Sequence, residues 1–351
     1  MKVCVLQEPG RLEVEERPDP VAGAGDVVIR VDAALTCGTD LKAYRRGHPK
    51  MPCPTVFGHE YAGTVVSVGE GVDAFAVDDE LMAANTGPCL ECFFCTRDQE
   101  NLCETIMEEM VLGAYAEYLR VPARVVRRNA FVKPADLSFE TAALLEPLAS
   151  VCAGLALLPA VQVRPPATVL LIGAGPISML WLLALRAHGA ERVVVLGRRT
   201  PRLEIARELG ALAAHADGPE FESAAADLTG GRGFDAVVEC TGLPEVWERA
   251  VSLSRRGGSA VLFGGCASGS VVRLDPYRLH YDGVRVSSPF HFRPRDVAES
   301  KRLLSMTELP WPRLITDRAT LADVPAVFER LAGAEGLKCA VHPHARAGEL
   351  S

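Results

Sequence analysis

The sequence has no excess of positive charge and no long uninterrupted apolar segment. It carries 37 Lys and Arg against 45 Asp and Glu, for a net charge of -8, which argues against nucleic acid or an anionic membrane surface as the main partner. The apolar stretch from Val169 to Leu185 is interrupted by glycine and Pro176, so it predicts a strand, a turn and a helix rather than a membrane span. We therefore expect a small molecule as the partner, and neither nucleic acid nor a membrane.

The sequence also lacks the pattern of an export signal. Its first residues alternate like a β-strand, without the apolar core and small-residue cleavage site of a signal peptide. Its eleven cysteines are an odd number, which without an export signal favours metal binding in a reducing compartment over a disulfide framework. We expect a cytoplasmic protein whose 351 residues form two domains of ordinary size.

Four of the cysteines follow one another with the spacing C-x2-C-x2-C-x7-C. They are Cys89, Cys92, Cys95 and Cys103. Zinc binds thiolates tetrahedrally, and a closed shell of four sulfurs leaves no position for a substrate. The spacing therefore predicts a structural zinc site, with a disulfide pair or four unrelated thiols as the alternative.

The two halves of the chain have different patterns. Before about Ala149, short β-rich runs such as 27–31 and 61–68 are separated by turns rich in Pro and Gly. From Thr168 onward, apolar β-branched runs alternate with helical segments, which is typical of a parallel sheet covered on both faces. The expected fold class is α/β, with a mostly-β domain and a doubly wound parallel-sheet domain.

A glycine-rich turn lies between the first strand and the first helix of this second half. Gly173 allows a tight turn, and Gly175 lets the backbone approach a pyrophosphate at a helix N-terminus. Ser178 takes the third glycine position and is small enough for close helix–strand packing. Many such turns bind nothing, but the strand–turn–helix context favours a dinucleotide site.

The end of the next strand indicates which dinucleotide binds. NAD sites carry an acidic residue there, but this chain reads Leu196-Gly-Arg-Arg-Thr. Arg198 and Arg199 can donate to a 2′-phosphate; a solvated helix start is the alternative, although cations are unfavourable at a helix N-terminus. NADP is therefore expected in preference to NAD. The candidate cofactor-binding residues are Gly173, Gly175, Pro176, Ile177, Arg198, Arg199, Arg202 and Thr241.

A possible reactive site lies in the first half. His59 and Glu60 stand in a glycine-rich segment, and Cys37 precedes them by about twenty positions. A lone cysteine or histidine is more often a core residue than a ligand. Taken by themselves, these residues are about equally consistent with a catalytic metal site and with ordinary core residues that bind no metal.

These motifs together resemble the zinc-containing medium-chain dehydrogenase/reductase family, in its alcohol and polyol dehydrogenase branch that includes sorbitol, sugar and threonine dehydrogenases. The segment 58–72, from Gly58-His-Glu-Tyr-Ala-Gly onward, matches the family's zinc signature, and the four-cysteine segment follows it. The resemblance implies a GroES-like catalytic domain at 1–150 and 289–351, with a structural zinc lobe near 87–104. It also implies a Rossmann domain at 151–288 and a homodimer or homotetramer.

The resemblance also implies a second, catalytic zinc, so that each chain holds two. Cys37, His59 and Glu146 match its ligands, glutamate at the third position being the polyol-branch form. Glu60 matches a residue beside the metal that can replace its water. Thr39 matches the residue that contacts the substrate oxygen and opens a proton relay.

The continuation of that relay is open. Lys42 stands where many relatives place a histidine, so Lys42, His48 or water can complete it. Thr39, Glu60 and Lys42 are the candidate catalytic residues. His291 and Arg293 can touch the substrate or cofactor, or cap the next helix.

The expected function is hydride transfer between NADP(H) and a secondary alcohol of a polyol, sugar, cyclitol or aminocyclitol. An amino alcohol of the threonine type or a simple secondary alcohol is the alternative substrate. Two further alternatives are the zinc-free branch of the same fold, which reduces activated double bonds, and a non-catalytic dinucleotide-binding protein that retains the cysteine lobe.

Overall fold

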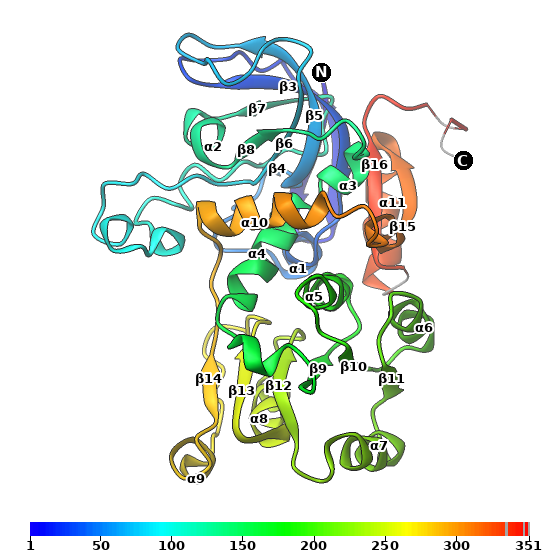
Figure 1. The fold of residues 1–351 in the computed structure, drawn as a ribbon. Coiled ribbons are helices and arrows are strands. Elements are labelled where there is room, and N and C mark those ends of the chain that lie inside the picture. Colours follow the sequence, from blue (N-terminus) through cyan, green and yellow to red (C-terminus); the bar gives the residue numbers. More distant parts are fainter. Residues whose placement is uncertain (334–335, 347, 350–351) are drawn as a thin grey trace. The chain divides into compact units, whose positions relative to one another are not determined.

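The computed structural model describes residues 1–333, 336–346 and 348–349 (Figure 1). The chain divides into two compact units. The first comprises Met1–Ala149, Arg293–Thr307 and Leu314–Ser351, and the second comprises Ser150–Phe292 and Glu308–Arg313. The short segment Glu308–Arg313 thus belongs with the second unit, which the sequence patterns did not indicate.

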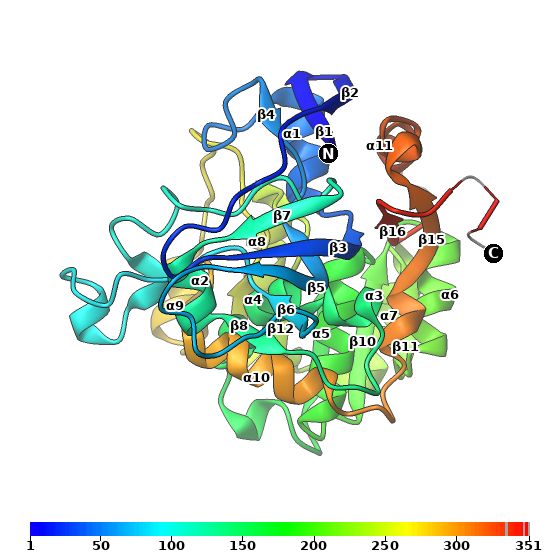
Figure 2. The same cartoon turned by 90° about the horizontal axis from the view of Figure 1, so that it is seen from above.

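Antiparallel pairing dominates the first unit. Its larger sheet has the order β15-β16-β3-β5-β6-β8, and β7 also pairs with β3; Figure 2 shows β7, β3, β5, β6 and β8 side by side. The strands are β3 (Val27–Leu35), β5 (Glu60–Val68), β6 (Glu80–Ala83), β7 (Tyr118–Val121), β8 (Ala130–Val132), β15 (Ile315–Thr320) and β16 (Lys338–His342). A smaller sheet, in the order β2-β1-β4, contains β1 (Lys2–Glu8), β2 (Arg11–Glu16) and β4 (Thr55–Val56).

Short helices complete this unit. They are α1 (Gly38–Arg46), α2 (Ala123–Arg128), α3 (Phe139–Ala142), α10 (Pro294–Leu304) and α11 (Val324–Ala332), with the 3-10 turns η1 (Cys95–Arg97), η2 (Glu100–Leu102) and η5 (Leu321–Asp323). The helix α4 (Leu145–Leu155) begins in the first unit and continues into the second. Ser300 of α10 donates a hydrogen bond to the Leu145 carbonyl, which ties the C-terminal segment to the start of α4.

The second unit is built on a parallel sheet in the order β11-β10-β9-β12-β13-β14, which can be followed across Figure 1. Its strands are β9 (Thr168–Ile172), β10 (Arg192–Gly197), β11 (Ala213–Ala216), β12 (Phe234–Glu239), β13 (Ser254–Leu262) and β14 (Arg285–Ser287). Its helices are α5 (Pro176–Ala187), α6 (Thr200–Glu208), α7 (Pro219–Thr229), α8 (Pro244–Leu253) and α9 (Pro276–His280), with the 3-10 turns η3 (Ala160–Gln162) and η4 (Trp311–Leu314).

The strand order of the second unit reverses direction next to β9. The chain passes outward from β9 through β10 to β11, and then returns to β12 on the other side of β9. Strands such as β9 are completely buried, as expected for a parallel sheet covered on both faces. The predicted α/β class with a doubly wound sheet is confirmed, and ligands of such sheets bind at the carboxyl ends of the strands where the order reverses.

No helix in the described part of the chain is both long and apolar enough to cross a membrane.

Gly63 of β5 lies against the backbone of β3 so closely that a side chain does not fit. A Cβ added at this position would stand 2.0 Å from the carbonyl oxygen of Arg30. We expect Gly63→Ala to lower the free energy of unfolding by about 1–3 kcal/mol or more, because backbone cannot move aside as a flexible side chain can. Urea unfolding measures this change. Gly265→Ala is the matched control, since a Cβ there meets no atom within 4 Å; equal midpoints for the two variants would contradict the expectation.

Candidate functional site

The four predicted zinc-lobe cysteines come together. The sulfur atoms of Cys89, Cys92, Cys95 and Cys103 all lie within 4.8 Å of one another. The two short turns η1 and η2 fold the segment back, and the Cys89 amide lies 3.4 Å from the Cys103 sulfur. Hydrogen bonds from the backbone at Cys95 and Glu104 lower the pKa of Cys92 to about 6. Backbone donors directed at clustered thiols favour the thiolate form, which is the form that binds zinc.

A second cluster lies where β3 and β5 meet. Leu35, the last residue of β3, pairs with Glu60, the first residue of β5. This register places Cys37, two residues beyond β3, beside His59, which precedes β5. Ligand atoms of Cys37, His59 and Glu60 lie within 4.8 Å of one another. The antiparallel ladder therefore brings together residues that are about twenty positions apart.

His59 is oriented by a carboxylate that sequence reasoning missed. Its Nδ1 lies 2.9 Å from Oδ1 of Asp40, and both side chains are buried. Burial disfavours a charged imidazole, but Asp40 and Cys37 outweigh burial and raise the pKa of His59 well above its usual value. An Nδ1 that faces a carboxylate carries the proton, so Nε2 is left as the ligand atom. Asp40 follows Cys37 by three residues, on the first turn of α1, and this spacing was the only available signal.

A buried ion pair fixes Glu60. The ammonium of Lys338, on β16, lies 2.5 Å from Oε2 of Glu60 and 3.0 Å from the Thr36 carbonyl oxygen. Both charged side chains are almost completely inaccessible. Oε1 of Glu60 has no hydrogen-bond partner among the described residues. This buried carboxylate oxygen receives no hydrogen bond and lies beside a thiol and an imidazole. Together the three groups form a set of ligands that fits zinc.

Glu146 lies near this cluster but outside the set of mutually close ligand atoms. It is the second residue of α4 and is 8% exposed. Its pKa is raised to about 7: burial is the largest cause and the charge of Glu60 adds to it, whereas the charges of His59 and Lys338 oppose the shift. Glu146 therefore lies near enough to His59, Glu60 and Lys338 for their charges to act on it. The close set among the described residues contains Glu60 instead.

The two residues predicted for the proton relay lie on α1. The Thr39 amide lies 3.4 Å from the Cys37 sulfur, which therefore caps the helix. Lys42 is exposed one turn further along. His48 is partly buried; burial and then the charge of Arg46 lower its pKa. Arg293 proves to cap α10, where it forms a reciprocal capping box with Asp296.

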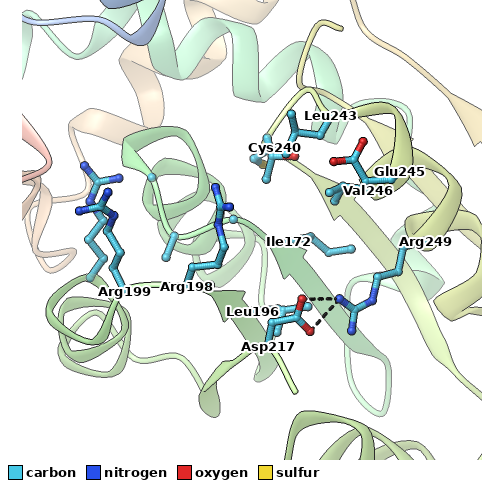
Figure 3. A pocket seen from close by; sticks show the side chains of 16 residues that line it. Ile172, Leu196, Arg198, Arg199, Asp217, Cys240, Leu243, Glu245, Val246 and Arg249 are labelled. Atoms are coloured by element: carbon cyan, nitrogen blue, oxygen red, sulfur yellow. Dashed lines mark hydrogen bonds and ion pairs between the residues drawn. The ribbon is translucent and has the colours of Figure 1, made fainter. Parts of the chain in front are cut away.

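The predicted dinucleotide site is a cavity of about 580 Å³ in the second unit (Figure 3). Six of the eight candidate cofactor residues line it: Gly173, Gly175, Arg198, Arg199, Arg202 and Thr241. Pro176 and Ile177 begin α5 beside the cavity without lining it. The cavity lies at the carboxyl ends of β9, β10 and β12, where the strand order reverses, which is the expected position of a ligand.

Gly197 has a packing role at the end of β10. A Cβ there would stand 2.6 Å from Cβ of Ala174 and 3.0 Å from Leu203. An acidic residue at this position would therefore need a local rearrangement. Burial and the neighbouring charge of Arg199 lower the pKa of Arg202. Neighbouring guanidinium groups repel one another, and a bound anion would relieve this repulsion. The site is therefore suited to an anion.

Sequence reasoning missed two carboxylates in this cavity, Asp217 and Glu245. Asp217, just beyond β11, lies 2.7 and 2.8 Å from one nitrogen of Arg249, and Figure 3 shows this pair on the cavity wall. The other terminal nitrogen of Arg249 donates to Glu222 at 2.8 Å. Asp217 therefore shares Arg249 with Glu222, and the three arginines Arg198, Arg199 and Arg202 face the remaining cavity carboxylate, Glu245.

Two family models match the chain. Residues 23–130 match the alcohol dehydrogenase GroES-like domain, and residues 176–306 match the zinc-binding dehydrogenase model. Both matches confirm the predicted combination of domains.

Known proteins are similar over most of the chain. Sorbitol dehydrogenase of Bacillus subtilis (strain 168) is 30% identical over 75% of this chain and 75% of its own length. D-arabinitol dehydrogenase 1 of Uromyces fabae is 28% identical over 98% of this chain and 97% of its own length. A solved structure assigned as a zinc-binding dehydrogenase of Sinorhizobium meliloti 1021, bound to NADP, matches with a TM-score of 0.88 and 28% identity. The match covers 97% of this chain and 99% of the other chain. The chain therefore belongs to the zinc-containing medium-chain dehydrogenase/reductase family and is a dehydrogenase of the alcohol and polyol type.

Proposed function

We propose that the enzyme transfers a hydride between NADP(H) and a secondary alcohol of a polyol or a related sugar, cyclitol or aminocyclitol. The observation that carries this proposal is the close set of half-buried Cys37 with buried His59 and Glu60, in a chain with an arginine-lined dinucleotide cavity. The names of the B. subtilis and U. fabae relatives, which are polyol dehydrogenases, support the substrate class.

The residues that would hold the catalytic zinc are Cys37, His59 and Glu146, with Glu60 beside them. When bound, zinc supplies a Lewis acid for the substrate oxygen. Asp40 keeps the proton on Nδ1 of His59, so that Nε2 faces the site. Lys338 balances the charge of Glu60 through one oxygen. Thr39 offers a hydroxyl, two residues from Cys37, that can take a proton from the substrate and pass it on.

An activity screen tests the proposal. The holoenzyme is assayed with NADP and with NAD against polyols, aldoses, cyclitols and amino alcohols. Turnover of polyols or cyclitols is the expected result. Turnover of amino alcohols alone would indicate a dehydrogenase of the threonine type. The absence of any turnover would favour a non-catalytic protein. The cytoplasmic location and the homodimer or homotetramer stay predictions.

We infer two zinc ions per chain, one of them held by Glu146. Glu146→Ala should lower the zinc content from about two per chain to about one, because the site loses an anionic ligand while the four-cysteine lobe stays intact. Glu146→Cys should retain both, since thiolate is a good zinc ligand. Elemental analysis after dialysis measures the content.

Glu140→Ala is the matched control for this change. Glu140 is a carboxylate of the same unit that binds Arg318 and His342 rather than the cluster at Cys37. If Glu146→Ala keeps two zinc ions while Glu60→Ala loses one, then Glu60 is the ligand and the assignment is wrong.

We infer a preference for NADPH from the arginines at the end of β10. A charged hydrogen bond to the 2′-phosphate contributes roughly 1.5–3 kcal/mol, or about ten- to a hundredfold in affinity. NADPH should bind more tightly than NADH, and Arg198→Ala with Arg199→Ala should remove the difference. Calorimetric titration with both cofactors measures it. Arg285→Ala, which removes an exposed arginine of β14, should leave the difference intact; equal affinities in the wild type would contradict the inference.

We infer that Thr39 begins the proton relay and Lys42 completes it. Thr39→Val should lower kcat by about 10²–10⁴-fold, the usual size of a general acid–base contribution, with zinc content and NADPH affinity nearly unchanged. Lys42→Ala should cost less, because water can substitute, and should alter the pH profile of alcohol oxidation. Weakened NADPH binding with an unchanged pH profile in Lys42→Ala would instead assign Lys42 to the cofactor.

A further inference from the structure

Tyr115 and the two residues before it are hydrogen-bonded to the segment that immediately precedes His59. Its amide donates to the Phe57 carbonyl at 3.0 Å, and its own carbonyl accepts from the Cys4 amide at 2.8 Å. The amides of Gly113 and Ala114 both donate to the Gly58 carbonyl. The backbone around Tyr115 is thus fixed to the two residues that immediately precede His59.

The aromatic ring of Tyr115 is confined from several sides. It packs edge-on against Phe57 and Phe328, with ring centres 5.9 Å away in both cases. Gly58 has a φ of +89°, and a Cβ there would stand 2.8 Å from the Tyr115 ring. The ring therefore occupies the space that a side chain at position 58 would need. The hydroxyl at its far end has little freedom to move.

That hydroxyl points to the carboxylate that contacts His59. It lies 2.9 Å from Oδ2 of Asp40 and 3.1 Å from the Leu35 carbonyl oxygen. The other oxygen of Asp40 lies 2.9 Å from Nδ1 of His59. A hydroxyl has one proton to donate, and the carboxylate is the stronger acceptor. Asp40 is completely buried, so the Tyr115 donor cannot be replaced readily by solvent.

We propose that Tyr115 is a positioning residue of the metal centre, whose hydroxyl holds Asp40 in place so that Asp40 in turn directs Nε2 of His59 toward the metal. The proposal rests on the proposed function, since it takes Cys37 and His59 as zinc ligands. Without the hydroxyl, Oδ2 of a buried carboxylate loses its side-chain donor, and Asp40 must move or bind a proton. Either response loosens the hold of Asp40 on His59.

The affinity of the apoprotein for zinc tests this role without any assay of turnover. Competition with a chromophoric chelator measures the weaker of the two zinc sites, and Cys37→Ser identifies that site as the one at His59. Loss of an outer partner of a metal-binding histidine costs about 10–100-fold in metal affinity. We expect Tyr115→Phe to weaken this site about tenfold and to leave the four-cysteine site unchanged.

Tyr61→Phe is the matched control. Tyr61 is the other completely buried tyrosine among the described residues, and its hydroxyl donates to the Ala84 carbonyl at 3.2 Å rather than to Asp40. Tyr61→Phe loses a buried hydroxyl of the same kind that has no contact with Asp40, so it reports the effect of losing such a hydroxyl without disturbing the Asp40–His59 contact. Equal zinc affinities in Tyr115→Phe and Tyr61→Phe would overturn the proposal.

A double-mutant cycle identifies the route of the effect. If Tyr115 acts through Asp40, Tyr115→Phe should change the zinc affinity less than twofold in an Asp40→Asn background. A full tenfold loss in that background would overturn the proposal. Asp40→Asn alone should weaken the site at least as much as Tyr115→Phe, and wild-type affinity in Asp40→Asn would overturn the proposal even if Tyr115→Phe did not fold. A wild-type protein that binds one zinc, unaffected by Cys37→Ser, would instead refute the catalytic zinc itself.

Discussion

The pairing of β3 with β5 is the constraint on which the metal cluster depends. Leu35 and Glu60 are opposite each other in this ladder, so the segment that leaves β3 and the segment that enters β5 meet at one end of the sheet. Cys37 lies on the first segment and His59 on the second. A shift of one residue in the register would turn Glu60 to the other face. Close contacts such as that of Gly63 with Arg30 oppose such a shift.

The same cluster shows how buried charge is accommodated. Asp40, His59, Glu60 and Lys338 are all nearly inaccessible, and each stands within 3 Å of an oppositely charged or hydrogen-bonding partner. Isolated charges in such a place would be strongly unfavourable. Among the described residues of this cluster, Oε1 of Glu60 is a buried carboxylate oxygen without a hydrogen bond, whereas Oδ1 of Asp40 lies 2.9 Å from Nδ1 of His59. The arrangement therefore holds its ligands in a defined geometry and keeps an acceptor oxygen available.

In the dinucleotide cavity, packing excludes an acidic side chain at the end of β10, and the charge of the neighbouring arginines favours a bound anion. The close approach of Ala174 and Leu203 to Gly197 leaves no space for a side chain at the end of β10. The following residues supply guanidinium groups, and the nearby carboxylate of Asp217 is paired with Arg249. The selectivity proposed for NADPH thus arises from one steric restriction and from an unequal distribution of charge.

The sequence by itself determined the features that depend on local spacing: the four-cysteine lobe, the alternation of strands and helices, and the glycine turn after β9. These patterns are readable because neighbouring residues encode the geometry of a single turn, strand or helix. Only the tertiary structure placed Tyr115 on Asp40 and Lys338 on Glu60, contacts that join residues 75 and 278 positions apart. It also placed Glu60, rather than Glu146, in the closest set with Cys37 and His59. Such contacts follow from strand register and from how separate segments pack together, and no local pattern in the chain specifies either.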